Sequence, residues 1–145
     1  MQKKMGFTLV ELMVVVTLII ILSSILLFTV SYYIKRSKDS NIIGNLSILI
    51  PAGEVYYTGP GRNSYGTAEP NFCSSSVVIN AFSQIPPLSY HFCKVNSFGD
   101  KWAACAHLFV DKDKAFCVDS RGVKENMPEG NCAAETGIGQ TAQCP

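Results

Sequence analysis

The sequence predicts an α+β fold in which a long N-terminal helix, membrane-spanning in its first half, packs on a small antiparallel sheet with disulfides. Three observations lead to this prediction. Residues 7–34 are apolar apart from Glu11, a second helical pattern covers residues 35–57, and the remainder has short strand-like segments and six cysteines. A chain of 145 residues is expected to hold one folded domain plus attachments.

The apolar run over residues 7–34 is the first element. As a helix with a rise of about 1.5 Å per residue it spans roughly 42 Å, which is enough to cross a bilayer. A secretory signal peptide has a shorter apolar core, of about 7 to 15 residues, and its small cleavage-site residue follows that core. Here the small residue, Gly6, comes before the run. We therefore expect a membrane-spanning helix.

Basic residues flank this run on both sides, so the positive-inside rule leaves its orientation open. The cysteines decide the orientation, because all six follow the run and none forms a CxxC pair: Cys73, Cys93, Cys105, Cys117, Cys132 and Cys144. This pattern is typical of disulfides formed in an oxidising compartment, with fifteen possible pairings. We expect the N-terminus in the cytoplasm and the cysteine-containing part outside it.

The amphipathic segment at residues 35–57 is the second half of the predicted helix. Its apolar residues recur at helical spacing on one face: Ile42, Ile43, Leu46, Leu49 and Ile50. Pro51 removes one helical hydrogen bond, so a kink is expected near it. Residues 58–66 are rich in Gly, Pro, Asn and Ser and predict a loop, with which a globular head of residues 58–145 begins.

Short strands are predicted in the head. Residues 89–95 alternate like a strand, residues 75–82 fit a strand or a short helix, and residues 101–120 predict a hairpin with a turn at 111–114. Residues 127–145 are polar and Gly-rich, which predicts a loop held by Cys132 and Cys144.

The predicted hairpin has a consequence for the cysteines. With a four-residue turn, Val110 faces Ala115 and Cys105 lies opposite Ser120, so Cys105 and Cys117 point to opposite faces. This register disfavours a bridge between those two cysteines.

Composition and motif spacing argue against several other functions. The 12 basic and 11 acidic side chains nearly balance, so no nucleic-acid footprint is indicated. Asp111 and Asp113 begin an EF-hand-like pattern, but Phe116 and Gly122 occupy positions that need Gly and Glu.

The histidines and aromatic residues of the head also have structural interpretations. The pairs His91 with Cys93 and His107 with Cys105 lack a second pair at metal-site spacing. We therefore expect no metal, no cofactor and no catalytic activity. Aromatic residues at strand positions are expected in the core rather than in a DNA-stacking surface: Tyr90, Trp102, Phe109 and Phe116.

The N-terminal stretch "GFTLVELMVVV" follows a short basic leader and resembles the signature of type IV pilins and pseudopilins. The resemblance implies that a prepilin peptidase recognises the leader with Lys3 and Lys4 and cuts between Gly6 and Phe7. It also implies that Phe7 becomes the N-methylated terminus. Residues 1–6 are then the leader peptide and residues 7–34 the transmembrane and filament-core helix.

The resemblance also implies an assembly role for Glu11. A carboxylate at membrane depth costs about 2.5 to 3.5 kcal/mol on insertion scales and needs a partner, which the Phe7 amine of a neighbouring subunit supplies. The expected partners are other pilin subunits, the prepilin peptidase, the inner-membrane assembly platform and membrane lipid. The expected location is the inner membrane, then an extracellular pilus or a periplasmic pseudopilus.

Three functions remain open from the sequence. The first is a structural subunit of a pilus-like filament, either major or minor, or a pseudopilin of a type II secretion or DNA-uptake system. The second is a tip adhesin or DNA-capturing module on the same scaffold. The third is a membrane-anchored extracellular protein unrelated to filaments.

Overall fold

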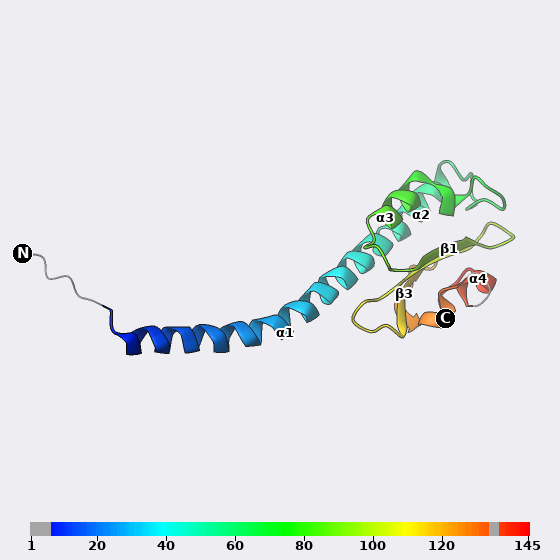
Figure 1. The fold of residues 1–145 in the computed structure, drawn as a ribbon. Helices are drawn as coiled ribbons and strands as arrows, with labels where there is room; N and C mark the ends of the chain where they lie inside the picture. The colour runs from blue at the N-terminus through cyan, green and yellow to red at the C-terminus, as the bar shows by residue number, and fades with distance from the viewer. Residues whose placement is uncertain (1–6, 134–136) are drawn as a thin grey trace, which may run out of the picture. The chain divides into compact units, whose positions relative to one another are not determined.

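The computed structural model describes residues 7–133 and 137–145. Its first element is the helix α1 (Leu9–Ser47), which α2 (Leu49–Thr58) follows after a single residue. The chain divides into two compact units, of which one ends at Ile34 and the other comprises Lys35–Pro145. The second unit is the globular head described below (Figure 1).

The interruption between α1 and α2 falls at Ile48, three residues before Pro51. Proline has no N–H to bond the carbonyl four residues earlier, and its ring presses on that carbonyl. For Pro51 this carbonyl belongs to Ser47, the last residue of α1. The helix is therefore interrupted close to Pro51, where the missing hydrogen bond leads us to expect a kink.

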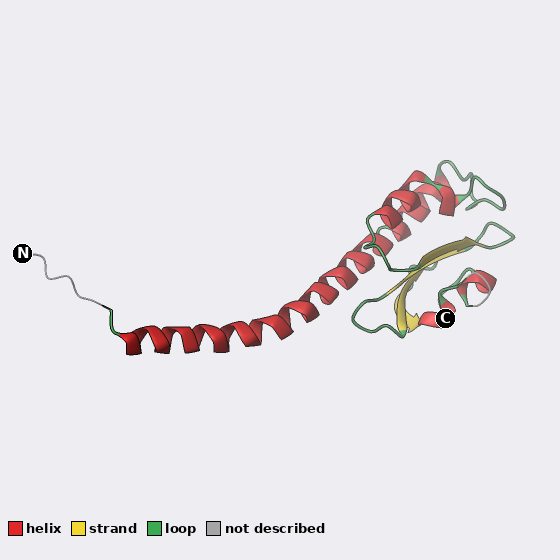
Figure 2. Ribbon diagram, in the orientation of Figure 1, coloured by secondary structure: helices red, strands yellow, loops and turns green. Residues whose placement is uncertain are grey.

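The other head elements are short helices and one antiparallel sheet (Figure 2). They are η1 (Phe72–Ser74), α3 (Ser76–Ser83), β1 (His91–Val95), β2 (Trp102–His107), β3 (Lys114–Asp119), β4 (Lys124–Pro128), η2 (Glu129–Asn131) and α4 (Ile138–Thr141). The strands pair in the order β1-β2-β3-β4 among the described residues. The predicted α+β fold, with a long helix packed on an antiparallel sheet, is confirmed.

Two parts of the head differ from the sequence prediction. Residues 75–82, which fitted either a strand or a helix, form most of α3. Residues 127–145 are not all loop, because Met127 is buried at the end of β4 and Ile138 is buried at the start of α4. Periodicity failed there because each element is too short to show one.

Both faces of the sheet are buried, one by helices and the other by the C-terminal segment. Trp102, Ala104 and Ala106 of β2 pack in a core with Ile42, Leu46 and Leu49 of the helices. The alternate residues Ala103 and Cys105 pack in a second core with Ile138 and the C-terminal cysteines. In Figure 1, α2 and α3 lie on one side of the sheet and α4 lies on the other.

The predicted hairpin register was wrong by three residues. His107, not Val110, pairs with Ala115, so Cys105 lies opposite Cys117 instead of Ser120. The cause is Asp39 of α1, whose buried carboxylate accepts hydrogen bonds from the backbone N–H groups of Phe109 (2.6 Å) and Val110 (3.0 Å). These two residues are held by the helix and leave the β-ladder, which lengthens the loop between β2 and β3.

Cys105 and Cys117 therefore lie on the same face of the sheet. Each nevertheless bonds a different C-terminal cysteine, in the pairs Cys105–Cys132 and Cys117–Cys144. The third disulfide, Cys73–Cys93, joins η1 to β1, and no cysteine is free. The predicted absence of a Cys105–Cys117 bridge holds, but for a different reason from the one the register suggested.

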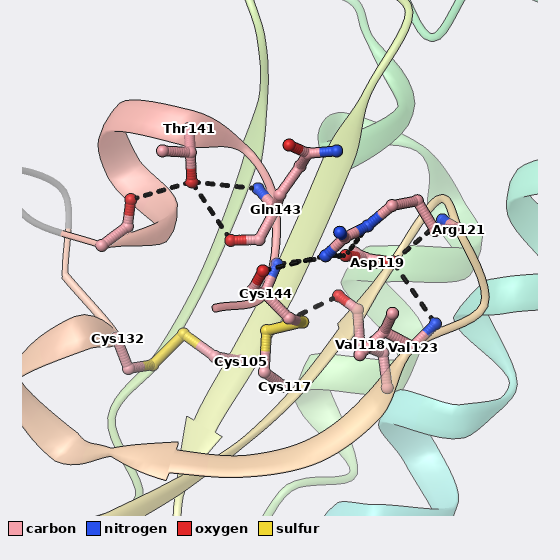
Figure 3. Close-up of a disulfide and its surroundings, with 11 residues drawn as sticks. Cys105, Cys117, Val118, Asp119, Arg121, Val123, Cys132, Thr141, Gln143 and Cys144 are labelled. Carbon is pink, nitrogen blue, oxygen red and sulfur yellow. Dashed lines mark hydrogen bonds and ion pairs between the residues drawn. A yellow bond between two sulfur atoms is a disulfide. The ribbon is translucent and has the colours of Figure 1, made fainter.

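A buried carboxylate helps the disulfides to hold the C-terminal residues in place (Figure 3). Asp119 is fully buried and accepts hydrogen bonds from the backbone N–H of Cys144 (3.1 Å) and of Arg121 (2.9 Å). The Arg121 guanidinium forms an ion pair with the same carboxylate at 2.6 Å and donates to the Cys144 carbonyl at 2.9 Å. The turn after β3 and the last residues of the chain are thereby fixed to each other.

The predicted aromatic core residues have mixed outcomes. Trp102 and Phe116 are buried and Phe109 packs against the helix-side core, but Tyr90 is 46% exposed, so the prediction for Tyr90 was wrong. Tyr90 lies just before β1 and stacks on His107, with ring centroids 5.1 Å apart.

Gly53 sets how closely α2 approaches the sheet. A Cβ atom at this position would lie 2.7 Å from Nε1 of the buried Trp102 ring, whereas one at Gly44 of α1 would meet nothing within 4 Å. A larger residue at Gly53 must therefore push the helix away from the tryptophan or move the ring out of its packed position.

We expect Gly53→Ala to lower the free energy of unfolding by about 1–3 kcal/mol, because overpacking outweighs the gain in helix propensity. Gly44→Ala is the matched control and should raise stability by about 0.5–1 kcal/mol. Thermal unfolding of the full chain in detergent, followed by Trp102 fluorescence, measures both. A Gly53→Ala protein as stable as the Gly44→Ala protein would contradict the close packing.

Candidate functional site

The N-terminal end of α1 contains the described residues to which the sequence assigned function. Thr8 immediately precedes α1, and Glu11 lies in its first turn. The Glu11 atom Oε2 accepts hydrogen bonds from the Thr8 backbone N–H (2.9 Å) and the Thr8 hydroxyl (2.7 Å). The Glu11 backbone N–H in turn donates to Thr8 Oγ1 at 3.3 Å. This reciprocal arrangement is a capping box, which satisfies N–H groups that the helix leaves unpaired.

Thr8 is the one residue of this site that the sequence analysis did not assign a role. The signal was available, because a Thr followed three residues later by Glu, directly before an apolar run, is the pattern of a capping box. From the sequence, Glu11 was assigned a role only for its charge. The structure adds that its side chain also starts the helix.

Within the described residues, the capping box leaves the charge of Glu11 without a counter-ion. Both groups that donate to its carboxylate belong to Thr8, and neither carries a charge. Both bonds also fall on Oε2, so within the described residues Oε1 has no hydrogen-bond partner. The carboxylate is therefore oriented by its own chain and still open to a cation.

The remaining assigned residues are distributed as follows. Phe7 precedes the capping box, and its side chain is 74% exposed. Lys3, Lys4 and Gly6 lie outside the described residues. The six cysteines are far along the chain in the head and all form disulfides, so they supply no thiolate.

The two histidines of the head have neighbours other than cysteine thiolates. His91 stacks on Phe82, with centroids 4.5 Å apart, and His107 Nδ1 lies 3.0 Å from Glu129 Oε1. In the part of the chain that the structure describes, no group of His, Cys, Asp and Glu is placed to hold a metal ion.

The helix that follows the capping box has the properties of a membrane span. Among the described residues, the helix over Leu9–Thr58 is long and apolar enough to cross a membrane, with a mean hydropathy of 2.9 in its most apolar window. Apolar side chains on all its sides are exposed, including Leu9 (72%), Val15 (45%) and Ile20 (62%). A helix that is apolar all round needs lipid or other helices around it.

The hydroxyl groups in this segment also suit an apolar environment. Thr17 Oγ1 donates to the Val14 carbonyl at 2.8 Å, and Ser24 Oγ donates to the Ile21 carbonyl at 2.8 Å. Because these hydroxyls bond to their own helix, they need no water or partner when lipid surrounds them.

Removal of the Thr8 side chain should loosen the start of the helix. In Thr8→Ala the Glu11 backbone N–H loses its acceptor, so its hydrogen exchange should become faster by about fivefold, the equivalent of about 1 kcal/mol of capping free energy. Amide exchange measured by NMR on the full chain in detergent micelles tests this. Thr17→Ala, which removes a hydroxyl within the same helix, is the control. Equal rates for the Glu11 amide in the two variants would show that Thr8 does not cap α1.

Comparison with known proteins gives one match, and it falls on this site. Residues 1–27 match the family model described as the prokaryotic N-terminal methylation motif. This motif is the prepilin signature of type IV pilins and pseudopilins. No curated protein and no solved structure matches the chain.

Proposed function

We propose that this chain, which carries the prepilin methylation signature at residues 1–27, is a structural subunit of a type IV pilus-like filament. A prepilin peptidase removes residues 1–6, Phe7 is N-methylated, and residues 7–34 form the filament core. The observation that carries the proposal is the capped, charged Glu11 at the start of an exposed apolar helix, within the matched motif.

Glu11 is the docking charge in this proposal. Cleavage after Gly6 creates an α-amine on Phe7, which keeps its positive charge after methylation. The Glu11 oxygen Oε1 has no partner among the described residues. In the filament it accepts a hydrogen bond from the Phe7 amine of a neighbouring subunit. An unpaired carboxylate at membrane depth costs about 2.5–3.5 kcal/mol, so pairing favours the assembled state over the separate subunits.

The proposed location follows from the helix and the disulfides together. The subunit is stored as a single-pass inner-membrane protein with its N-terminus in the cytoplasm. Three disulfides support placing the head in an oxidising compartment on the other side of the membrane. The partners are the prepilin peptidase, the inner-membrane assembly platform and other subunits, which replace lipid around residues 7–34 in the filament.

Mass spectrometry of the mature N-terminus tests the processing step. We expect a chain that begins at Phe7 and carries the mass of one added methyl group when the protein is produced together with a prepilin peptidase. Gly6→Val should leave the chain uncut, because the peptidase site needs the small residue before Phe7. An intact Met1 in the unmodified protein, or a cut beyond Ile34, would overturn the proposal.

Neutralisation of Glu11 tests the assembly step. Glu11→Gln keeps an oxygen that accepts the Thr8 hydrogen bonds, so the chain should enter the membrane normally. The neighbour's Phe7 amine is then left unpaired at a cost of about 2.5–3.5 kcal/mol, and filament yield should fall by about tenfold or more. Sedimentation of sheared filaments measures the yield.

The matched control is Glu69→Gln, which removes one carboxylate from an exposed loop of the head. Its filament yield should equal that of the unmodified chain. A normal yield from Glu11→Gln would contradict the docking role. An equal loss in both variants would show that the yield depends on net charge and not on Glu11 itself.

A further inference from the structure

We infer that the head binds the phosphate-bearing headgroup of an anionic phospholipid in a cavity beside Lys35. The inference rests on the proposed storage of the subunit in the membrane, and it concerns the subunit before assembly. The cavity has a volume of about 410 Å³, within the range of about 300–1,000 Å³ for small-molecule sites. Its walls include Lys35, Leu88, Ser89, His107, Phe109 and Lys112.

The charge of this cavity comes from two lysines without counter-ions. Lys35 on α1 and Lys112 in the loop between β2 and β3 are exposed, and neither forms an ion pair within the described residues. The nearby Lys114 differs, because its ammonium pairs with Asp111 at 2.9 Å. Two ammonium groups that converge on one cavity from separate elements favour an anion with several oxygens.

The carboxylates near the cavity are hydrogen-bonded to groups other than these two lysines. Glu129 also lines it, but its Oε1 lies 3.0 Å from His107 Nδ1. Asp39 bonds with both oxygens to the backbone N–H groups of Phe109 and Val110. Lys38, the other cation on this part of α1, lies over the Phe109 ring at 4.7 Å from its centroid. Lys35 and Lys112 remain available to a ligand.

Leu88 gives the same cavity an apolar rim. Its side chain is 98% exposed, and its backbone has a φ of +77°, a left-handed conformation that is costly for leucine. The next residue is attached to the sheet, because the Ser89 hydroxyl donates to the His107 carbonyl at 2.7 Å. An apolar side chain held outward at a backbone cost suits contact with an apolar phase, not with water.

The position of Lys35 in the chain puts this residue, which lines the cavity, at the level of the membrane surface in the proposed storage state. Lys35 directly follows the apolar residues 7–34, so a membrane that covers this run ends at the level of its headgroups beside Lys35. In the proposed orientation, Lys35, Arg36 and Lys38 lie on the translocated side, where the positive-inside rule disfavours basic residues. Binding of anionic headgroups explains why they are present there.

The combination of charged and apolar residues in the cavity walls favours a lipid over a free anion. Inorganic phosphate would gain from the two lysines but nothing from Leu88, Leu108 or Phe109, which also line the cavity. A phospholipid offers both parts, a phosphate for the ammonium groups and acyl carbons for the apolar rim. Each lysine near an anionic surface contributes about fivefold in binding, so a preference of about 25-fold is expected from two.

The experiment measures lipid preference on the full chain in phosphatidylcholine vesicles. Traces of spin-labelled phosphatidylglycerol or phosphatidylcholine report by electron spin resonance how much of each lipid the protein immobilises. We expect phosphatidylglycerol to bind about 25-fold more strongly. The double variant Lys35→Gln/Lys112→Gln should lose this preference, whereas Lys94→Gln/Lys124→Gln, which removes two exposed lysines outside the cavity, should keep it.

Other outcomes overturn the inference. Equal binding of the two lipids by the unmodified chain, or an equal loss in both double variants, would exclude a headgroup site in this cavity. Lysine-dependent binding of inorganic phosphate by the chain in detergent, seen by ³¹P NMR, with no lipid preference in vesicles, would identify a free-anion site. Loss of filaments from the Lys35→Gln/Lys112→Gln chain with the lipid preference intact would assign the cavity to contact between subunits.

The same measurement separates this inference from the proposed function. A chain that does not enter the bilayer immobilises no lipid of either kind, which would contradict membrane storage itself. A chain that immobilises both lipids equally is membrane-inserted and contradicts only the headgroup site. Near-ultraviolet circular dichroism of each variant, which reports the packing of Trp102, shows that the head remains folded.

Discussion

The fold depends on the apolar stripe that α1 and α2 bury against the sheet. Ile42, Leu46 and Leu49 have no exposed surface, and the strands supply Trp102 and small alanines on the facing side. Upstream of Lys35 the same helix is apolar on every side. The two halves meet different demands, because lipid solvates a helix from all directions while a small head in water can cover only one stripe.

This packing leaves the other face of the sheet to be covered. The C-terminal segment covers it with Ile138, but it has too few apolar residues to hold itself in place. Two disulfides and the buried Asp119 carboxylate attach it to β2 and β3. In the chain-entropy model a bridge that closes a loop of about 27 residues contributes about 3.5 kcal/mol, so the folded head relies on oxidation. This reliance agrees with the proposed location outside the cytoplasm.

Charges that have no counter-ion among the described residues stand at both ends of the apolar run. Glu11 is hydrogen-bonded by uncharged groups of Thr8, and Lys35 forms no ion pair within the described residues. The capping box explains how Glu11 is tolerated before assembly, since it orients the carboxylate without neutralising it. In the proposals made above, each charge gains its partner from outside the chain, a neighbour's amine for Glu11 and a lipid phosphate for Lys35.

The sequence by itself determined the features that depend on local pattern. The long apolar run specified the membrane helix, and Pro51 specified the helix interruption. Helical spacing specified the buried stripe of Ile42, Leu46 and Leu49, although Ile43, expected on the same face, is 37% exposed. The Gly6, Phe7, Thr8 and Glu11 motif gave the prepilin resemblance, which the match at residues 1–27 confirms. Even the capping box was readable, because its partners are only three residues apart.

Only the tertiary structure decided the features that depend on residues far apart in the chain. Asp39 shifts the hairpin register through two hydrogen bonds across about 70 residues of sequence. The local sequence around Phe109 does not predict this register. The disulfide pairing, the exposure of Tyr90 and the cavity shared by Lys35, Leu88 and Lys112 likewise arise from packing between separate elements. Periodicity reports which face of one element is buried, whereas the identity of what covers that face is fixed only when the elements meet.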